Sequence, residues 1–152
     1  MSIIKKILLS ILVVFAVIQF IRPASNKSSG VLVTDISKLM NIPDSVQVIL
    51  KNACYDCHSN NTDYPWYVNI QPIGWLMAKH IKQGKEDLNF SEFGSYSLRK
   101  QLSKLTGIAN SITDDNMPLS SYKWMHNDAQ LSKDEKIVII NWAQQSKDSL
   151  SK

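Results

Sequence analysis

The residues with the clearest chemistry are two cysteines three positions apart, Cys54 and Cys57, and the histidine that follows them, His58. They are the only two cysteines in the chain. In this Cys-x-x-Cys-His spacing each thiol can add across one vinyl group of a haem, while the adjacent imidazole binds the iron from one side. The pattern predicts covalent attachment of one c-type haem, with His58 as the proximal iron ligand.

Two other uses of a cysteine pair explain the sequence less completely. A thioredoxin-like redox pair is expected to open a helix after a strand in an alternating β-α-β chain, which this sequence does not show. A zinc site needs four ligands, and the chain has neither a second cysteine pair nor two histidines at a zinc-binding spacing. Haem attachment accounts for all three residues of the motif.

Several residues are candidates for the opposite side of the iron. Met117 is favoured because it lies in a polar loop and a proline follows it, which biases its backbone toward an extended conformation. His80 is the next candidate, and Met125 and His126 are minor ones. Each has an ordinary alternative, since methionines fill cores and a lone histidine is more often packed and hydrogen-bonded than bound to iron. Met77 is interpreted as a core residue.

The chain begins with a segment typical of export. Lys5 and Lys6 precede an apolar run over residues 7–21. Such a segment directs a chain into the membrane and leaves the lysines in the cytoplasm. The run is shorter than the roughly 20 residues of a full span, so residues 1–22 are either a signal peptide or a signal anchor; the missing small-x-small cleavage site favours the anchor. We expect the rest of the chain in the periplasm, attached to a bacterial inner membrane.

The remainder of the sequence predicts one all-α domain. Residues 23–42 are interpreted as a flexible linker and lead-in, 43–147 as the haem domain and 148–152 as a tail, and only residues 31–33 weakly suggest a strand. Apolar residues at intervals of three and four, with their capping and breaking residues, predict four helices. The expected helices are 44–54, 72–83 with an end at Gly84, 95–111, and a last one that follows the capping pattern Ser132–Glu135.

Charge outside the N-terminal segment is nearly balanced. Three of the 17 basic residues lie in that segment, so the formal charge of +4 falls to +1 for the remainder. With two haem propionates the domain is close to neutral, and a nucleic-acid partner is not expected. Lys79, Lys82 and Lys85 are interpreted as a solvated helix face, with a docking patch for an acidic redox partner as the alternative. Asp114 and Asp115 are interpreted as loop solvation.

Four aromatic residues follow the haem motif closely in the sequence. Their large apolar rings, with hydroxyl and indole donors, predict a wall for the porphyrin and contacts to its propionates. The alternative is ordinary core packing. The four are Tyr64, Trp66, Tyr67 and Trp75.

The sequence over about residues 43–145 resembles the haem-binding domain family of exported bacterial proteins. The resemblance implies a cytochrome c-like fold in which the first and last helices pack together. It also implies Cys54 and Cys57 as thioether sites, His58 as proximal ligand and Met117 as distal ligand. The segment 64–93 departs from small cytochromes and leaves ligation by His80 open. The similar positions are Cys54–Tyr67, Pro72, Trp75, His80, Gly84, Leu88–Glu92, Met117–Pro118, His126 and Leu131–Glu135.

The expected function is electron transfer without catalysis. A histidine and a thioether occupy both axial positions and leave no site for a substrate. Such a domain is expected to exchange single electrons with a redox partner protein at the membrane. The alternative is a haem-based sensor or ligand-binding module in which Met117 is displaced, and a peroxidase-type enzyme with a distal histidine ranks last.

Overall fold

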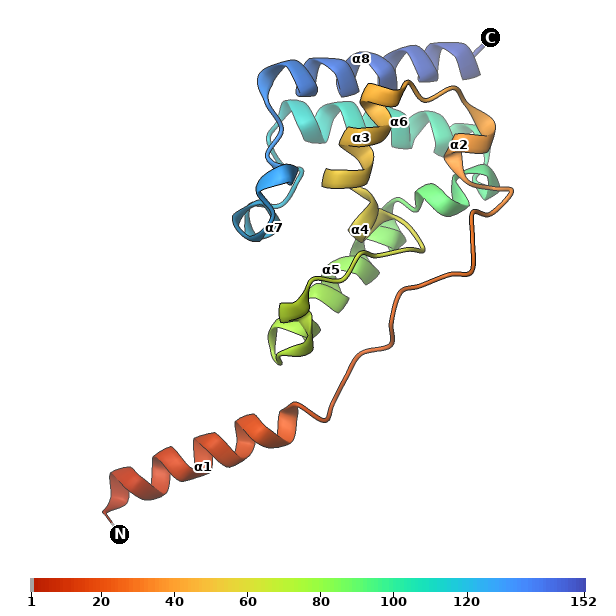
Figure 1. Cartoon of the computed structure of the whole chain (residues 1–152). Helices are drawn as coiled ribbons and strands as arrows, with labels where there is room; N and C mark the ends of the chain where they lie inside the picture. The colour runs from red at the N-terminus through yellow and green to blue at the C-terminus, as the bar shows by residue number, and fades with distance from the viewer. Residues whose placement is uncertain (1) are drawn as a thin grey trace.

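The computed structural model describes residues 2–152 as helices and loops, without a strand (Figure 1). An all-α fold was predicted and is confirmed. The α-helices are α1 (Ile3–Ile18), α2 (Ile36–Leu39), α3 (Asp44–Ala53), α4 (Tyr55–His58), α5 (Ile73–Asp87), α6 (Leu98–Thr113), α7 (Ser120–Met125) and α8 (Lys133–Leu150). Three 3-10 turns join them: η1 (Trp66–Asn69), η2 (Phe90–Ser95) and η3 (Asn127–Ala129).

The hydrophobic core lies between α3, α6 and α8. The helices α6 and α8 lie side by side, and α3 packs against α8, so the first and last helices of the domain are in contact (Figure 1). Leu50, Leu105 and Ile139 are fully buried there, one from each helix. The apolar stripes that predicted these helices are therefore the faces that form the core.

The helix boundaries follow the predictions with two corrections. The second predicted helix does not end at Gly84 but continues to Asp87. Gly84 lets α5 lie close to the backbone of Cys57, because a Cβ at position 84 would lie 2.6 Å from the Cys57 carbonyl oxygen. The third begins at Leu98 rather than residue 95, because η2 occupies the preceding residues. The predicted capping box is present, with Ser132 and Glu135 bonded to each other's backbone amides.

Residues 23–42 are not a free linker. The Asn26 side chain donates to the Ser59 carbonyl at 2.8 Å and to the Thr62 hydroxyl at 2.9 Å, and accepts a 2.6 Å bond from Lys85. Ile36 is fully buried and belongs to the core. The polar composition that suggested flexibility instead supplies hydrogen bonds to the domain.

The helix α1 packs none of its side chains into the domain, since it has no buried residue. Its end is nevertheless attached, because the Gln19 side chain exchanges two hydrogen bonds with the backbone of Gln71. Among the described residues, no helix combines the length and apolar character that crossing a bilayer requires.

Candidate haem site

The cysteine motif forms a single helical turn directly after α3. Cys54 ends α3, and its carbonyl oxygen accepts bonds from the amides of Cys57 and His58 at 3.2 and 3.0 Å. Positions three apart on a helix lie on the same side, so both thiols are available to one ligand. Neither cysteine is in a disulfide. This local geometry suits two thioether bonds to one planar group.

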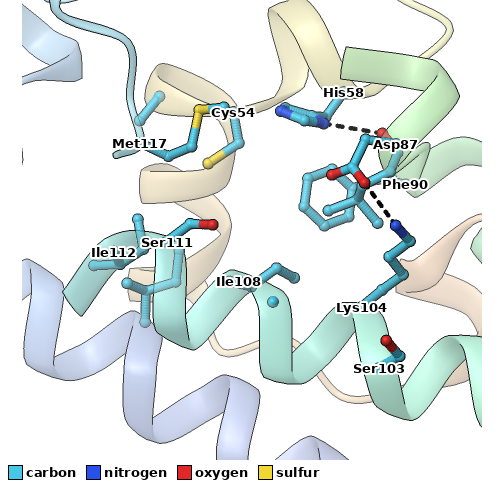
Figure 2. Close-up of a pocket in the computed structure, with 14 residues that line it drawn as sticks. Cys54, His58, Asp87, Phe90, Ser103, Lys104, Ile108, Ser111, Ile112 and Met117 are labelled. Atoms are coloured by element: carbon cyan, nitrogen blue, oxygen red, sulfur yellow. Dashed lines mark hydrogen bonds and ion pairs between the residues drawn. The ribbon is translucent and has the colours of Figure 1, made fainter. Parts of the chain in front are cut away.

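His58 is held in one orientation by a hydrogen bond. Its Nδ1 lies 2.9 Å from the carbonyl oxygen of Leu88, the residue after α5 (Figure 2). Because a carbonyl only accepts, Nδ1 carries the proton and Nε2 keeps its lone pair. Metal-binding histidines are commonly oriented this way by a partner on the other ring nitrogen. The arrangement leaves Nε2 available to iron.

Two adjoining cavities lie beside the motif and share Ala53, His58, Asp87 and Met117 as lining residues. The first, of about 210 Å³, extends between the motif and α6 (Figure 2). The second, of about 310 Å³, extends toward α5. Further lining comes from Cys54, Phe90, Ile108 and Ile112 in the first cavity and from Cys57, His80, Gly84, Pro118 and Tyr122 in the second.

The loop that carries Met117 is fixed at three points. The Met117 amide donates to the carbonyl of Ser111 at 3.2 Å, and Pro118 is buried. Asp115 is exposed in the loop, as its interpretation as loop solvation expects, and it also forms an ion pair with Lys136 of α8. The hydrogen bond from Lys136 lowers the pKa of the Asp115 carboxyl. The methionine therefore faces both cavities from a constrained loop.

Asp56 and Tyr122 form a contact that the sequence did not reveal. The Tyr122 hydroxyl donates to Asp56 Oδ2 at 2.6 Å, and Asp56 Oδ1 accepts from the Asp63 amide at 2.8 Å. Burial, followed by the hydrogen bond to Asp56, raises the pKa of Tyr122. Asp56 lies inside the haem motif, so this contact joins the motif to the helix that follows Met117. No spacing rule pairs residues so far apart in the sequence.

The other predicted iron ligands divide into two groups. His80 is half-buried and lines the second cavity with His58 and Met117. His126 lines neither cavity; its ring stacks on Tyr122 with centroids 3.9 Å apart, and its Nε2 lies 3.1 Å from the Tyr67 hydroxyl. Met125 is 43% exposed and also lies outside both cavities. Met117 and His80 are thus the two candidates that the fold brings next to His58.

The structure places the four predicted aromatic wall residues elsewhere, since none lines either cavity. Trp66 is 76% exposed, and the Trp75 indole donates to the carbonyl of Ile21 at 2.8 Å. The Tyr64 hydroxyl accepts from the amide of Asn26. Nearness to the motif in sequence did not bring these four side chains into the lining of either cavity. The aromatic lining comes instead from Phe90 and Tyr122.

The two thiols are not activated. Burial raises the pKa of Cys54 to about 12, with a smaller contribution from Cys57, and burial raises the pKa of Cys57 to about 11, with a smaller contribution from Asp56. Redox-active cysteines usually have lowered pKa values, because the thiolate is the nucleophile. The thiols of this chain stay protonated at neutral pH, which argues against the redox-pair interpretation.

The residues present fit a covalently bound haem. The imidazole of His58 and Met117 line both adjoining cavities, and one free thiol lines each of them: Cys54 the first and Cys57 the second. The cation of Lys104 lies at the side of the first cavity away from Cys54 in Figure 2, where it donates to Asp87 at 2.7 Å. Such a cation is suited to a propionate.

One comparison with known proteins identifies a haem-binding family. A family model described as haem-binding domain matches residues 13–145. Searches of curated proteins and of solved structures gave no match to this chain.

Proposed function

Because the chain belongs to the haem-binding domain family, we propose that it holds one c-type haem and transfers single electrons at a membrane. Cys54 and Cys57 are the thioether sites, and His58 is the proximal ligand. When bound, the haem supplies a one-electron iron couple. The observation that carries the proposal is the shared lining of both cavities by His58 and Met117.

Met117 is the sixth ligand in this proposal. Its loop is fixed to Ser111 and, through Asp115, to Lys136, so the sulfur can be held beside the cavity at little entropic cost. A thioether opposite a histidine raises the reduction potential and fills the last iron position. The protein then makes no bond to a substrate, which favours a carrier over an enzyme. The fold on this proposal is a cytochrome c-like variant with an added α5 segment.

A ligand-binding or sensor module is the second candidate. The second cavity, of about 310 Å³, lies between Met117 and His80 and gives a small molecule room beside the proximal histidine. If Met117 leaves the iron readily, a diatomic gas can take its place. His80 provides the third arrangement, ligation by two histidines.

The N-terminal segment supports the proposed location. Every described side chain of α1 outside its last residue is exposed, and its only charges are Lys5 and Lys6. Apolar side chains on all faces of a helix require an apolar surrounding, which lipid provides. We propose export to the periplasm with α1 in the inner membrane, where a redox partner protein is within reach. Haem attachment of the c type also takes place outside the bacterial cytoplasm.

The first experiment is the optical spectrum of the full haem-loaded chain, oxidised, reduced, and reduced under carbon monoxide. We expect low-spin iron with a methionine-to-iron charge-transfer band and no change with carbon monoxide. Met117→Ala should abolish the band and lower the potential, whereas Met125→Ala, outside the cavities, should change neither. A carbon monoxide-sensitive wild type would instead support the sensor. Loss of low-spin iron only in His80→Ala would replace Met117 by His80.

A further inference from the structure

We propose that the haem domain rests directly on an anionic phospholipid surface, through a face at the junction of α1 with η1 and α5. This inference rests on the membrane attachment proposed above and adds the orientation of the domain. The face, here called the α5 face, consists of the exposed apolar residues Phe20, Ile21, Trp66, Ile70, Ile73 and Leu76.

Three hydrogen bonds fix this face next to the end of α1. Gln19 Oε1 accepts from the Gln71 amide at 2.9 Å, and Gln19 Nε2 donates to the Gln71 carbonyl at 3.3 Å. The third runs from the Trp75 indole to the carbonyl of Ile21 at 2.8 Å. Gln71 is 1% exposed, so its backbone bonds are shielded from competing water. Figure 1 shows the start of α5 as the part of the domain that turns toward α1.

The next residues of the chain prevent the domain from swinging away. Asn26 is bonded to Ser59, Thr62 and Lys85, and the amide of Ser28 donates to the Asn61 side chain at 3.2 Å. The connection between α1 and the domain is therefore not a free tether. If α1 is in the bilayer, the start of α5 has to lie at its surface.

The exposed side chains at this junction suit the bilayer interface. Trp66 is 76% exposed and Phe20 88% exposed, and both are costly to leave in water. Tryptophan concentrates at membrane interfaces because its ring is apolar and its indole N–H can reach water. Ile73 and Leu76, in the first turn of α5, are also exposed, at 41% and 50%.

Charge supports an anionic lipid surface rather than a protein partner of mixed charge. The first acidic residue of the chain is Asp35, and residues 64–85 contain no Asp or Glu. The same segment carries Lys79, Lys82 and Lys85, of which the first two are exposed; Lys82 lies 3.9 Å from Glu86, and Lys85 donates to Asn26. Basic residues close to a membrane surface are attracted to anionic lipids. Continuity with the apolar α1 makes lipid, rather than a second protein, the occupant of the α5 face.

The test places a photo-crosslinking residue on the full haem-loaded chain in vesicles of phosphatidylethanolamine and phosphatidylglycerol. Benzoylphenylalanine replaces Trp66 in one variant and Trp124 in the matched control, which is 82% exposed but lies on α7. Flotation with the vesicles reports attachment by α1, and mass spectrometry counts lipid adducts. We expect on the order of tenfold more adduct from position 66 than from position 124, because only the α5 face meets the interface.

A second variant tests the attachment itself. Gln19→Ala combined with Trp75→Phe removes the three hydrogen bonds and, at the end of α1, the bond from the Gln19 side chain to the Phe15 carbonyl, but leaves residues 3–18 unchanged. It should lower the adduct yield at position 66 while the chain still floats. Equal yields at positions 66 and 124, or none at 66, in a floating chain overturn this inference alone. A chain that does not float overturns both the inference and the proposed attachment. The optical spectrum tests the haem proposal separately.

Discussion

The two parts of the molecule that meet at the haem motif are stabilised in different ways. The first, the core lobe, comprises residues 36–53 and 88–150. The second, the α5 lobe, comprises residues 59–87 with the attached residues 19–28. Every member of the buried apolar cluster belongs to the core lobe, and none to residues 59–87.

The α5 lobe buries only two large apolar side chains, Met77 and Ile81, and relies more on buried polar groups. Ser59, Thr62 and Gln71 are each at most 5% exposed. The Thr62 hydroxyl donates to the Asp56 carbonyl at 2.6 Å, and the Gln71 side chain accepts from the Trp75 amide at 3.1 Å. Each hydrogen bond contributes only about 1 kcal/mol net, because the unfolded chain bonds to water. Leaving a buried polar group without a partner costs more free energy than one such bond contributes. The hydrogen bonds therefore fix one conformation of the α5 lobe without making it very stable.

This difference shows what the haem does for the fold. The second cavity is lined by His80 and Gly84 of the α5 lobe and by Met117 and Tyr122 of the core lobe. A ligand in that space touches both lobes and stabilises their contact by mass action. Before haem is attached, we expect the core lobe to be ordered without help from the α5 lobe. We expect the α5 lobe to open more readily than the core lobe.

The largest effect should come from the core lobe. Leu105 is fully buried between α6 and its neighbours, so Leu105→Ala removes apolar contacts and leaves a cavity. We expect a loss of about 2–5 kcal/mol in the free energy of unfolding, measured by urea denaturation. Leu98→Ala on the same helix, where the side chain is 53% exposed, should cost less than about 1 kcal/mol. Equal losses would show that the apolar cluster does not dominate stability.

The contact between the lobes is tested at Gly84. A Cβ there would lie 2.6 Å from the Cys57 carbonyl oxygen, a backbone atom that cannot easily move. Gly84→Ala should therefore cost about 1–3 kcal/mol and lower the yield of haem attachment, measured from the ratio of haem to protein absorbance. Gly107→Ala is the matched control before haem attachment, because nothing lies within 4 Å of its Cβ and alanine favours a helix. A fully matured Gly84→Ala protein would contradict the close approach.

The sequence predicted the core lobe far better than the α5 lobe. Val46, Ile49 and Leu50 repeat at intervals of three and four, and this period identifies both the helix and its buried face. The capping box at Ser132 was equally explicit. The prediction for Cys54, Cys57 and His58 could also be made without a structure, because the proposed haem motif is contiguous.

The α5 lobe and the rest of the site left no comparable pattern. The contacts of Asn26 with Ser59 and of Tyr122 with Asp56 join residues far apart in sequence, and single polar residues have no period. A polar segment was therefore interpreted as a linker, and Gly84 as a helix end. Asp115 also adopts a positive φ of 56°, which nothing in the sequence predicted. The structure at these positions depends on tertiary hydrogen bonds and close backbone approaches, which the local sequence does not encode as a pattern.

The α5 lobe should respond locally when its polar contacts are removed. Asn26→Ala deletes three side-chain hydrogen bonds and should cost about 1–2 kcal/mol. We expect faster amide hydrogen exchange in residues 59–87, measured by mass spectrometry, with little change in α6 and α8. Asn69→Ala is the control, because its side chain bonds only to the nearby Trp66 carbonyl. Uniformly faster exchange would mean that the two lobes open as one unit.

The smallest effect concerns the thiols at the boundary of the lobes, before haem attachment. The folded pKa values of about 12 for Cys54 and 11 for Cys57 exceed the ordinary value of 9.0. Between pH 9 and these values the unfolded chain releases thiol protons that the folded chain retains, so stability falls as pH rises and is insensitive to the thiols below pH 9.

By pH 10 the loss should be about 1 kcal/mol for each thiol, measured by urea denaturation at pH 8 and pH 10. The Cys54→Ala/Cys57→Ala variant keeps the other groups that titrate at alkaline pH. Its free energy of unfolding should therefore fall less between pH 8 and pH 10. If the proposed covalent attachment holds, the haem-loaded protein has thioethers in place of thiols and should lack this difference too. The difference in unfolding free energy between the thiol form and the double variant should therefore change between pH 8 and pH 10. If it does not change, the motif is open to water before haem is attached. The boundary between the lobes would then close only with the cofactor.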